Sequence, residues 1–200
     1  MPTPFEIIAA PVVVYQAAIG EAFPLIDATV AGNWNKIGTS GDRNIPEDGV
    51  TVAHSQEIEP FYSIGGTGPQ KVFRTREGFI VRFTLADLPL EQYARVLNDN
   101  TVTDTAAQGG IAGFRDVDIY RGAEVSQVAL LIRGLFSAYG DTWNTQFEIP
   151  NCFQTGSPEP VFQKGTPAAL AFEYTAIEDP LAATSGDRFG KLVMMDAAQA

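Results

Sequence analysis

The sequence predicts a mainly β protein, a sandwich or barrel of short strands with one flanking helix. Three observations support this fold class: apolar and polar residues alternate along most segments, glycines and prolines separate these segments, and one segment has helical spacing. With 200 residues, of which 45% are hydrophobic and 18% charged, the chain is long enough for one domain with a buried core. We therefore expect residues 1–200 to form a single domain.

A two-residue period marks most of the segments that we expect to be strands. Along residues 79–85, four apolar side chains point to one face and the residues between them to the other. Residues 128–133 are apolar on nearly both faces. Trp143 is in phase with Phe147 and Ile149, so we expect it in the core. The expected strands are residues 12–17, 50–58, 79–85, 117–120, 128–133, 143–149 and 170–175.

One segment, residues 87–98, has the spacing of an amphipathic helix. Asp87 is expected to be its N-cap, Pro89 is tolerated in the first turn, and Asn98 can end it. A lone helix between strands agrees with a mainly β class. The apolar stripe that would pack on a sheet consists of Leu90, Tyr93, Ala94 and Leu97.

Two stretches have no regular period. Residues 38–76 are rich in glycine and contain the strand-like residues 50–58, so we interpret them as one long hairpin. Residues 182–200 mix Gly, Ser and Asp with an apolar patch, and we expect an arm that becomes ordered only against a neighbouring molecule. The tip of the hairpin consists of Ile64, Gly65, Gly66, Thr67, Gly68 and Pro69.

Charge and cysteine content restrict the class of partner. The net charge is −11, from 24 acidic and 13 basic residues, and the basic residues are scattered, which argues against specific binding of nucleic acid. The same acidity also has a simple explanation in solubility. Cys152 is the single cysteine, so we expect no intrachain disulfide, a small buried hydrophobe, and synthesis in the cytoplasm. The longest apolar run near the start, residues 11–15, is too short to span a bilayer, and we expect no membrane partner.

The residues that most enzymes use are sparse in this chain. His54 is the single histidine and lies in an expected strand, where we interpret it as a solvated residue. Two acidic pairs each share a strand face, but no histidine or third acid accompanies them, which favours a solvated acidic surface. These pairs are Glu57/Glu59 and Asp116/Asp118. The glycine-rich tip lacks the spacing of a phosphate-binding loop. We expect no enzyme activity, catalytic residue, cofactor or metal.

The order of segments along the chain resembles a known protein family. A short polar segment precedes the glycine-rich hairpin, a charged strand follows it, and this strand runs directly into the helix before further strands complete the core. The segments that carry the resemblance are Gly32-Asn33-Trp34-Asn35-Lys36-Ile37-Gly38, Glu47-Asp48-Gly49-Val50 and Phe73-Arg74-Thr75-Arg76-Glu77. Over residues 30–180 this order resembles the tail-tube, or major tail, proteins of long-tailed (siphovirus-type) bacteriophages.

The resemblance implies a structural role in a virion, the phage tail. Subunits of that family form hexameric rings that stack into a tube, and DNA passes through the lumen without specific binding. The partners would be further copies of the chain and the terminator, tape-measure and distal tail proteins. Residues 38–76 and 182–200 would bridge the rings, with residues 64–69 as the ring-stacking loop. Carboxylates in the lumen would repel DNA phosphates. The candidates for that surface are Glu57, Glu59, Asp116, Asp118 and Glu148.

Two alternatives to the tube subunit stay open. Another tail component of related fold, such as a tail terminator or a baseplate hub, would form a closed ring that does not elongate. A monomeric ligand-binding β-sandwich would need exposed aromatic side chains, for which Trp34 is a candidate.

Overall fold

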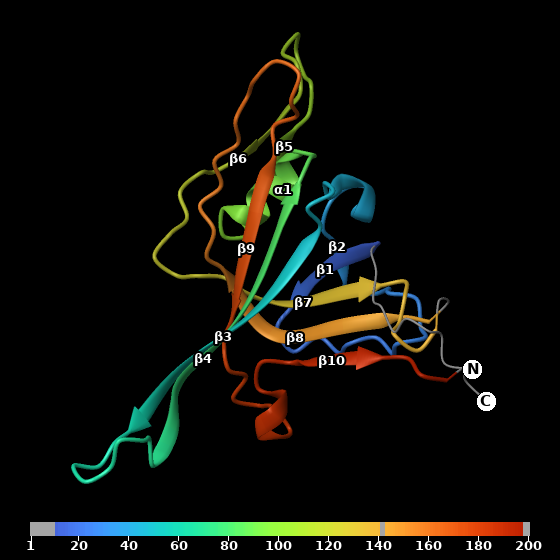
Figure 1. Cartoon of the computed structure of the whole chain (residues 1–200). Helices are drawn as coiled ribbons and strands as arrows, with labels where there is room; N and C mark the ends of the chain where they lie inside the picture. Colours follow the sequence, from blue (N-terminus) through green and yellow to red (C-terminus); the bar gives the residue numbers. More distant parts are fainter. Residues whose placement is uncertain (1–10, 141–142, 198–200) are drawn as a thin grey trace.

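The computed structural model describes residues 11–140 and 143–197, and it is mainly antiparallel β-structure with one α-helix in that part of the chain (Figure 1). The predicted fold class is therefore confirmed. The strands are β1 (Val12–Ala18), β2 (Asn35–Lys36), β3 (Val50–Phe61), β4 (Lys71–Leu85), β5 (Val102–Thr105), β6 (Phe114–Val117), β7 (Gln127–Gly134), β8 (Thr145–Gln154), β9 (Leu170–Ala176) and β10 (Lys191–Met194). The helical elements are α1 (Leu90–Val96) and the 3-10 turns Gly41–Asn44 and Ser185–Asp187.

A single bent sheet supplies both layers of the sandwich. Its strand order is β2-β1-β7-β8-β9-β4-β3, with β10 also paired to β8, while β5 and β6 form a separate hairpin. The bend lies in β8, where residues 145–148 pair with β10 and residues 152–154 pair with β9. The strands β9, β4 and β3 therefore cross over the layer of β1, β7 and β8 (Figure 1), and the inner faces of both layers enclose the core.

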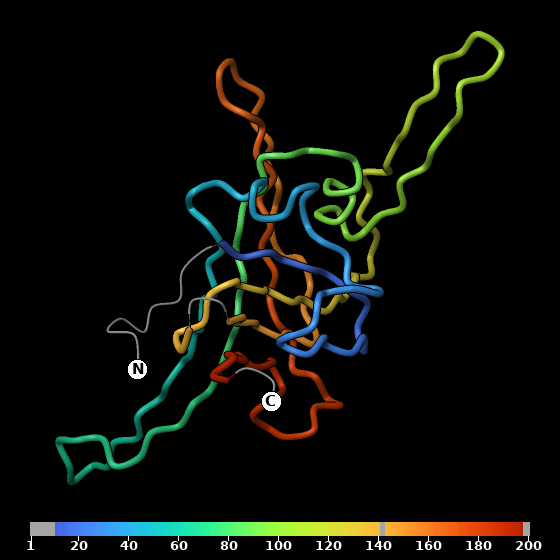
Figure 2. Tube along the Cα trace, turned by 90° about the vertical axis from the view of Figure 1, so that its right-hand side faces the viewer, coloured from blue at the N-terminus to red at the C-terminus, as the bar shows by residue number. Residues whose placement is uncertain are grey.

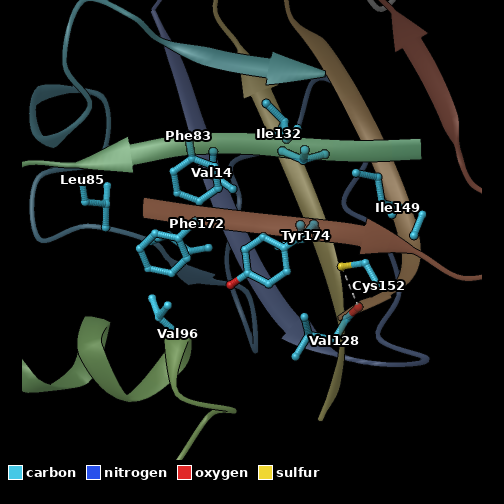
Figure 3. Close-up of a cluster of buried hydrophobic side chains, with 14 of the residues drawn as sticks. Val14, Phe83, Leu85, Val96, Val128, Ile132, Ile149, Cys152, Phe172 and Tyr174 are labelled. Carbon is cyan, nitrogen blue, oxygen red and sulfur yellow. Dashed lines mark hydrogen bonds between the residues drawn. The ribbon is translucent and has the colours of Figure 1, made fainter. Parts of the chain in front are cut away.

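The core consists of the residues that the two-residue period predicts. The side chains of Phe79, Val81, Phe83 and Leu85 are all buried, and Phe83 stacks on Phe172 of β9 with 4.9 Å between ring centroids (Figure 3). Strand β7 is buried on both faces, as its sequence indicates.

Cys152 is a buried core residue, as predicted (Figure 3). Its thiol donates a hydrogen bond to the carbonyl oxygen of Val128 over 3.2 Å, and burial raises the pKa of that thiol. A thiol held in its protonated form is a poor nucleophile, so this residue contributes packing and not chemistry.

The helix is shorter than the sequence predicts, and Asp87 is not its N-cap. Helix α1 begins at Leu90 after Pro89, while the carboxylate of Asp87 accepts hydrogen bonds from the backbone N–H (3.0 Å) and the hydroxyl of Thr39. Asn98 does follow the end of the helix, with φ of 102°. Its side-chain amide donates to the carbonyls of Arg121 and Glu124 and accepts from Ser126, so it fastens the loop before β7.

The buried tryptophan is Trp34, and the expectation for Trp143 is wrong. Trp143 precedes β8 and is half-buried, whereas Trp34 is 7% exposed. The indole of Trp34 donates to the carbonyl of Ala22 over 2.9 Å and contacts the ring of Phe23 at 5.1 Å between centroids. An irregular segment, residues 19–34, thus covers the outer apolar face of β1 and β7, which forms a second small core.

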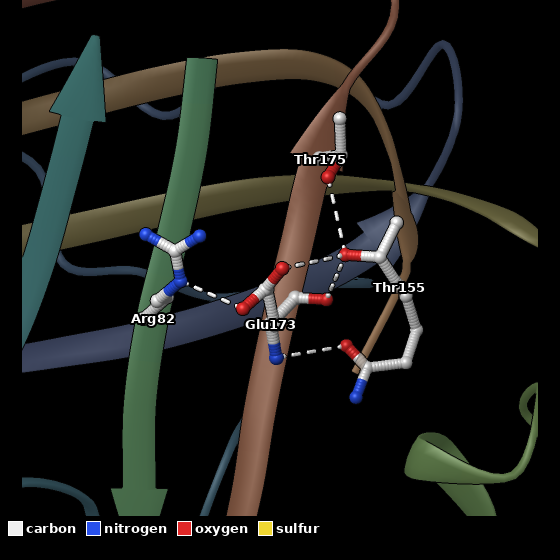
Figure 4. A network of polar contacts seen from close by, with 5 residues as sticks. Arg82, Thr155, Glu173 and Thr175 are labelled. Carbon is white, nitrogen blue, oxygen red and sulfur yellow. Dashed lines mark hydrogen bonds and ion pairs between the residues drawn. The ribbon is translucent and has the colours of Figure 1, made fainter. Parts of the chain in front are cut away.

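A polar network joins β4, β9 and the chain that leaves β8 (Figure 4). Arg82 donates to the carboxylate of Glu173 over 2.6 Å, and the backbone N–H of Thr155 donates to the carbonyl of Glu173 over 2.8 Å. The side-chain oxygen of Gln154 accepts from the backbone N–H of Glu173 over 3.0 Å. These bonds fix the base of the loop that follows β8.

We expect Glu173→Gln to reduce the dependence of stability on pH. The hydrogen bond from Arg82, assisted by one from Thr155, lowers the pKa of Glu173 below its ordinary 4.5. A lowered folded-state pKa means that the stabilisation is complete above pH 4.5 and is lost as the pH falls through the lowered value. Chemical denaturation between pH 6 and 2 should show a steeper loss for wild type than for Glu173→Gln. Glu159→Gln, a variant in an exposed loop, is the control and should lose stability as steeply as wild type. An equally steep loss in Glu173→Gln would contradict the prediction.

Candidate functional site

The most prominent feature of the molecule is the hairpin of β3 and β4, which extends beyond the body (Figures 1 and 2). Strand β9 pairs with β4 only from Ile80 to Leu85. Past that point, β3 and β4 pair only with each other in the part of the chain that the structure describes. We refer to residues 58–75 as the distal ribbon. It is a two-stranded structure whose two outer edges are both free, an arrangement that is marginally stable alone in water.

The hairpin has different bounds from those predicted. It spans residues 50–85, whereas the predicted range was 38–76. Residues 38–49 belong to the body, because Ile37 beside them is fully buried and donates its backbone N–H to Val14 over 2.9 Å. The 3-10 turn Gly41–Asn44 follows and contacts β1. Only residues 50–76 of the predicted range therefore belong to the projecting hairpin.

A β-bulge marks where the distal ribbon leaves the body. Glu57 lies opposite Arg76, but the next residue, Ile58, lies opposite Arg74, so Thr75 is an extra residue on β4. Bulges bend a strand pair and increase its twist, which sets the direction of the ribbon relative to the sheet.

Both faces of the distal ribbon expose large apolar side chains. Residues that lie opposite each other share a face, so Val72 lies on the face of Ile58, and Phe61 on the face of Phe73. The Lys71 ammonium lies 5.1 Å from the ring centroid of Phe73. A sheet in a lone molecule keeps one apolar face against its core, and this ribbon covers neither. The large hydrophobic side chains, between 49% and 110% exposed, are Ile58, Phe61, Tyr62, Ile64, Val72 and Phe73.

The predicted stacking loop lies at the outermost point of the ribbon. Residues 64–69 connect its two strands, and Ile64 is fully exposed. Gln70 closes the turn, donating its backbone N–H to Phe61 over 2.8 Å and its side-chain amide to Ser63 over 2.7 Å. The apolar residues that flank this tip on both strands were not among the predicted site residues. Their signal in the sequence is apolar side chains on both faces of a strand pair beside a glycine-rich turn.

The hairpin is balanced in charge although the chain is strongly acidic. Residues 54–79 contain three acids and three bases, whereas the whole chain has a net charge of −11. Two ion pairs use four of them, Arg76 with Glu57 at 3.6 Å and Arg74 with Glu77 at 3.4 Å. The remaining acid and base of this range are Glu59 and Lys71. Because exposed ion pairs contribute little to stability, the consequence of this balance is a surface that does not repel a second acidic copy.

The five predicted lumen residues do not lie together on one surface of the subunit. Glu57 and Glu59 lie on the β3–β4 hairpin, while Asp116 and Asp118 lie in or just after β6, near the opposite end of the body (Figures 1 and 2). Glu148 is only 7% exposed, so its assignment to an open surface is wrong.

The burial of Glu148 has a specific cause. Its carboxylate accepts a hydrogen bond from Gln146 and pairs with Lys191 of β10 at 3.4 Å. Gln146 in turn accepts from the buried Arg133, which also donates to the carbonyl of Leu25 over 3.0 Å. The segment around Leu25 therefore covers the outer face of β7 and β8 and is held there by a continuous polar network.

The C-terminal segment is part of the subunit's own sheet. Residues 191–194 form β10 on the edge of β8, and the Ser137 hydroxyl donates to the carbonyl of Met195 over 2.8 Å. The expectation of an arm that orders only against a neighbour is therefore wrong for these residues, because β8 offers them a free edge within the chain. Residues 198–200 of the predicted arm lie outside the described residues.

A cavity of about 650 Å³ lies between the base of the hairpin, β8 and the C-terminal segment. We call it the basal pocket. Aromatic and aliphatic side chains form part of its lining, namely Phe79, Phe147, Ile149, Phe189 and Leu192. Its six charged residues form three ion pairs, which are Arg74–Glu77, Arg188–Glu178 and Lys191–Glu148, at 3.2 to 3.4 Å. This pairing leaves no free charge directed at a polar ligand.

Among the described residues, no group of three or more His, Cys, Asp or Glu side chains could hold a metal ion. His54 is exposed on β3, where its ring and that of Phe79 form a T-shaped pair with 4.6 Å between ring centroids. No helix in the described ranges is long and apolar enough to cross a bilayer. Comparison of the sequence with protein-family models and with curated proteins finds no match.

Proposed function

We propose that this chain is a structural subunit that assembles with copies of itself into stacked hexameric rings, the tail tube of a phage. The observation that carries the proposal is the distal ribbon. It exposes apolar residues on both faces, has two free edges and is balanced in charge. Such a ribbon becomes stable when a neighbour covers it, so a monomer is an incomplete state of this fold.

The projecting segments lie at opposite ends of the molecule, an arrangement that favours stacking. The distal ribbon leaves the body at one end, while the β5–β6 hairpin and the loop between β8 and β9 leave it at the other, and both views agree on this (Figures 1 and 2). Contacts between opposite ends of identical molecules are head-to-tail, and repetition of such a contact produces a filament or tube.

The free strand edges support a ring within each layer. Strand β3 ends the eight-stranded sheet on one side and the two-residue β2 ends it on the other. An unprotected edge of twelve residues such as β3 is a template for pairing with a neighbouring sheet. Joining edges around a ring removes both free ends.

The acidic character of the chain agrees with DNA as the cargo of the tube. Carboxylates lining a lumen repel phosphates, so DNA could slide through without binding. Because Glu148 is buried, the remaining candidates for the lumen are Glu57, Glu59, Asp116 and Asp118. Their positions at two ends of the subunit would place them at different heights along the tube.

Electron microscopy of the purified chain tests the proposal. We expect negatively stained samples at high protein concentration to contain rings and hollow tubes, and sedimentation velocity to show a broad distribution of large species. Single closed rings that never elongate would indicate a terminator or hub instead. A monodisperse monomer at all concentrations would contradict self-assembly and favour a ligand-binding sandwich.

A further inference from the structure

The loop between β8 and β9 has an apolar tip and no net charge. In residues 154–169 the single acid and the single base, Glu159 and Lys164, cancel. Just before the turn at its outer end, which Gln163 and Thr166 close, Val161 is 63% exposed and Phe162 is 78% exposed. The hydrogen bonds around Glu173 fix the base of the loop, and the loop projects from there away from the body (Figures 2 and 4).

The basal pocket has the complementary properties at the other end of the molecule. Its volume of about 650 Å³ lies within the range of roughly 300–1,000 Å³ that is usual for binding pockets. Apolar side chains line it, and its ion pairs leave it balanced in charge. Phe147 and Phe189 are only partly buried there, so an apolar group that entered would complete their packing.

Electrostatics limits which surfaces of two copies can approach each other. Each copy has a net charge of −11, so most pairs of surfaces repel. The loop of residues 154–169 and the basal pocket are two exceptions, because each contains equal numbers of acids and bases. Close contact between them costs no net charge repulsion and buries apolar side chains on both partners.

We infer that the tip formed by Val161 and Phe162 of one copy inserts into the basal pocket of the next copy. The loop between β8 and β9 and the segments that line the pocket, the base of the hairpin and β10, lie at opposite ends of the body (Figures 1 and 2). The contact is therefore head-to-tail and leaves a free tip and a free pocket at the two ends of any chain of subunits. The inference rests on the proposed self-assembly and names the pair of surfaces that would join successive rings.

Two variants separate the partners of this contact. Phe162→Ala removes the tip but keeps the pocket. Gly186→Trp keeps the tip but fills the pocket, and the site tolerates a side chain because a Cβ there meets only the Thr184 hydroxyl oxygen, at 3.7 Å. Ile111→Ala is the matched control, since Ile111 is 71% exposed on the β5–β6 hairpin at the same end as Phe162. Circular dichroism verifies that each variant is folded.

Sedimentation equilibrium of each variant alone, and of an equimolar mixture with one variant tagged, is the decisive measurement. We expect each variant to associate about tenfold or more weakly than wild type, because the loss of one buried aromatic side chain is enough for such a change. The mixture should form a heterodimer, because the intact tip of Gly186→Trp can bind the intact pocket of Phe162→Ala. Ile111→Ala should associate like wild type.

The outcomes distinguish this contact from the proposed function. Tubes of wild-type length from both variants, or a mixture that associates no better than its components, would overturn the contact while leaving the tube in place. A heterodimer in the mixture, together with a wild type that forms short chains but no tubes, would support the contact and contradict the tail tube. A loss in Ile111→Ala equal to that in Phe162→Ala would overturn the assignment to this loop.

Discussion

Replacement of the distal ribbon, residues 58–75, by Asn-Gly should abolish elongation and leave a folded subunit. Glu57 and Arg76 face each other across the strand pair, and a two-residue turn of this type can join them. The core is untouched, because its residues in β4 start at Phe79. We expect the unfolding free energy to change by no more than about 1 kcal/mol, since the ribbon makes no contact with the core.

The effect on assembly should be large. The ribbon carries six exposed large hydrophobic residues, and burial of one such side chain contributes about 1.5–3 kcal/mol. Burial of only two of them against a neighbour gives about 3 kcal/mol or more, which raises the concentration needed for assembly roughly a hundredfold when it is lost. Electron microscopy and pelleting at increasing concentration measure this. Tubes of normal length from the shortened protein would refute the role of the ribbon.

The matched control shortens the other hairpin in the same way. Thr105 and Phe114 face each other, so Asn-Gly can replace residues 106–113. This hairpin projects from the other end of the body and is a separate two-stranded sheet. If shortening either hairpin abolishes elongation equally, the loss is a general effect of truncated projections, and the ribbon has no special role.

Local periodicity accounts for what could be predicted of the fold. Residues 79–85 alternate strictly, and alternate side chains of one strand point to the same face wherever the strand lies in the protein. The core face of β4 followed directly from that pattern. By contrast, β2, β5 and β10 are two to four residues long, too short to show a period.

Burial by irregular segments could not be predicted in the same way. The outer faces of β7 and β8 are covered by residues 19–34, which have no period that reveals this contact. For this reason the sequence offers Trp34 as an exposed aromatic of a ligand-binding sandwich and Glu148 as a lumen residue, and both are buried. One signal was present: β7 is apolar on both faces, so a second layer had to cover it, and β8 lies next to it in that layer.

The candidate site was predicted in position but not in composition. A glycine-rich turn between two strands identifies a hairpin tip by its backbone freedom alone, so residues 64–69 were found. Which flanking residues stay exposed depends on where β9 stops pairing with β4, and that is a long-range contact. The sequence therefore located the tip, while the structure added Phe61, Val72 and Phe73 as the apolar surface.

Gly190→Ala should detach β10 from the edge of β8. Gly190 has φ of +110°, and a Cβ at this position would overlap the backbone carbonyl of Glu148. That carbonyl belongs to a strand paired on both sides, so it cannot move away. Backbone strain of about 1–2 kcal/mol and an overlap of about 1–3 kcal/mol then oppose docking of β10.

Detachment is the less costly response, because β10 holds few contacts. It has four residues, Leu192 is 44% exposed, and its ion pair from Lys191 to Glu148 is half in solvent. We therefore expect hydrogen exchange of the amides in residues 191–194 to accelerate at least about tenfold, with a loss of about 2 kcal/mol in the unfolding free energy. Gly186→Ala lies in the same segment and should change neither quantity, because a Cβ there makes only an ordinary contact with the Thr184 hydroxyl oxygen, at 3.7 Å.

The same substitution links the C-terminal strand to assembly. Lys191 and Leu192 form part of the wall of the basal pocket, so detachment of β10 removes the surface that receives the Phe162 tip. Gly190→Ala should then associate with Gly186→Trp no better than either protein associates alone, because neither has an intact pocket, while its intact tip should still bind the pocket of Phe162→Ala. Retained protection of residues 191–194 would contradict the detachment. Lost protection with unchanged association would show that the pocket does not need β10.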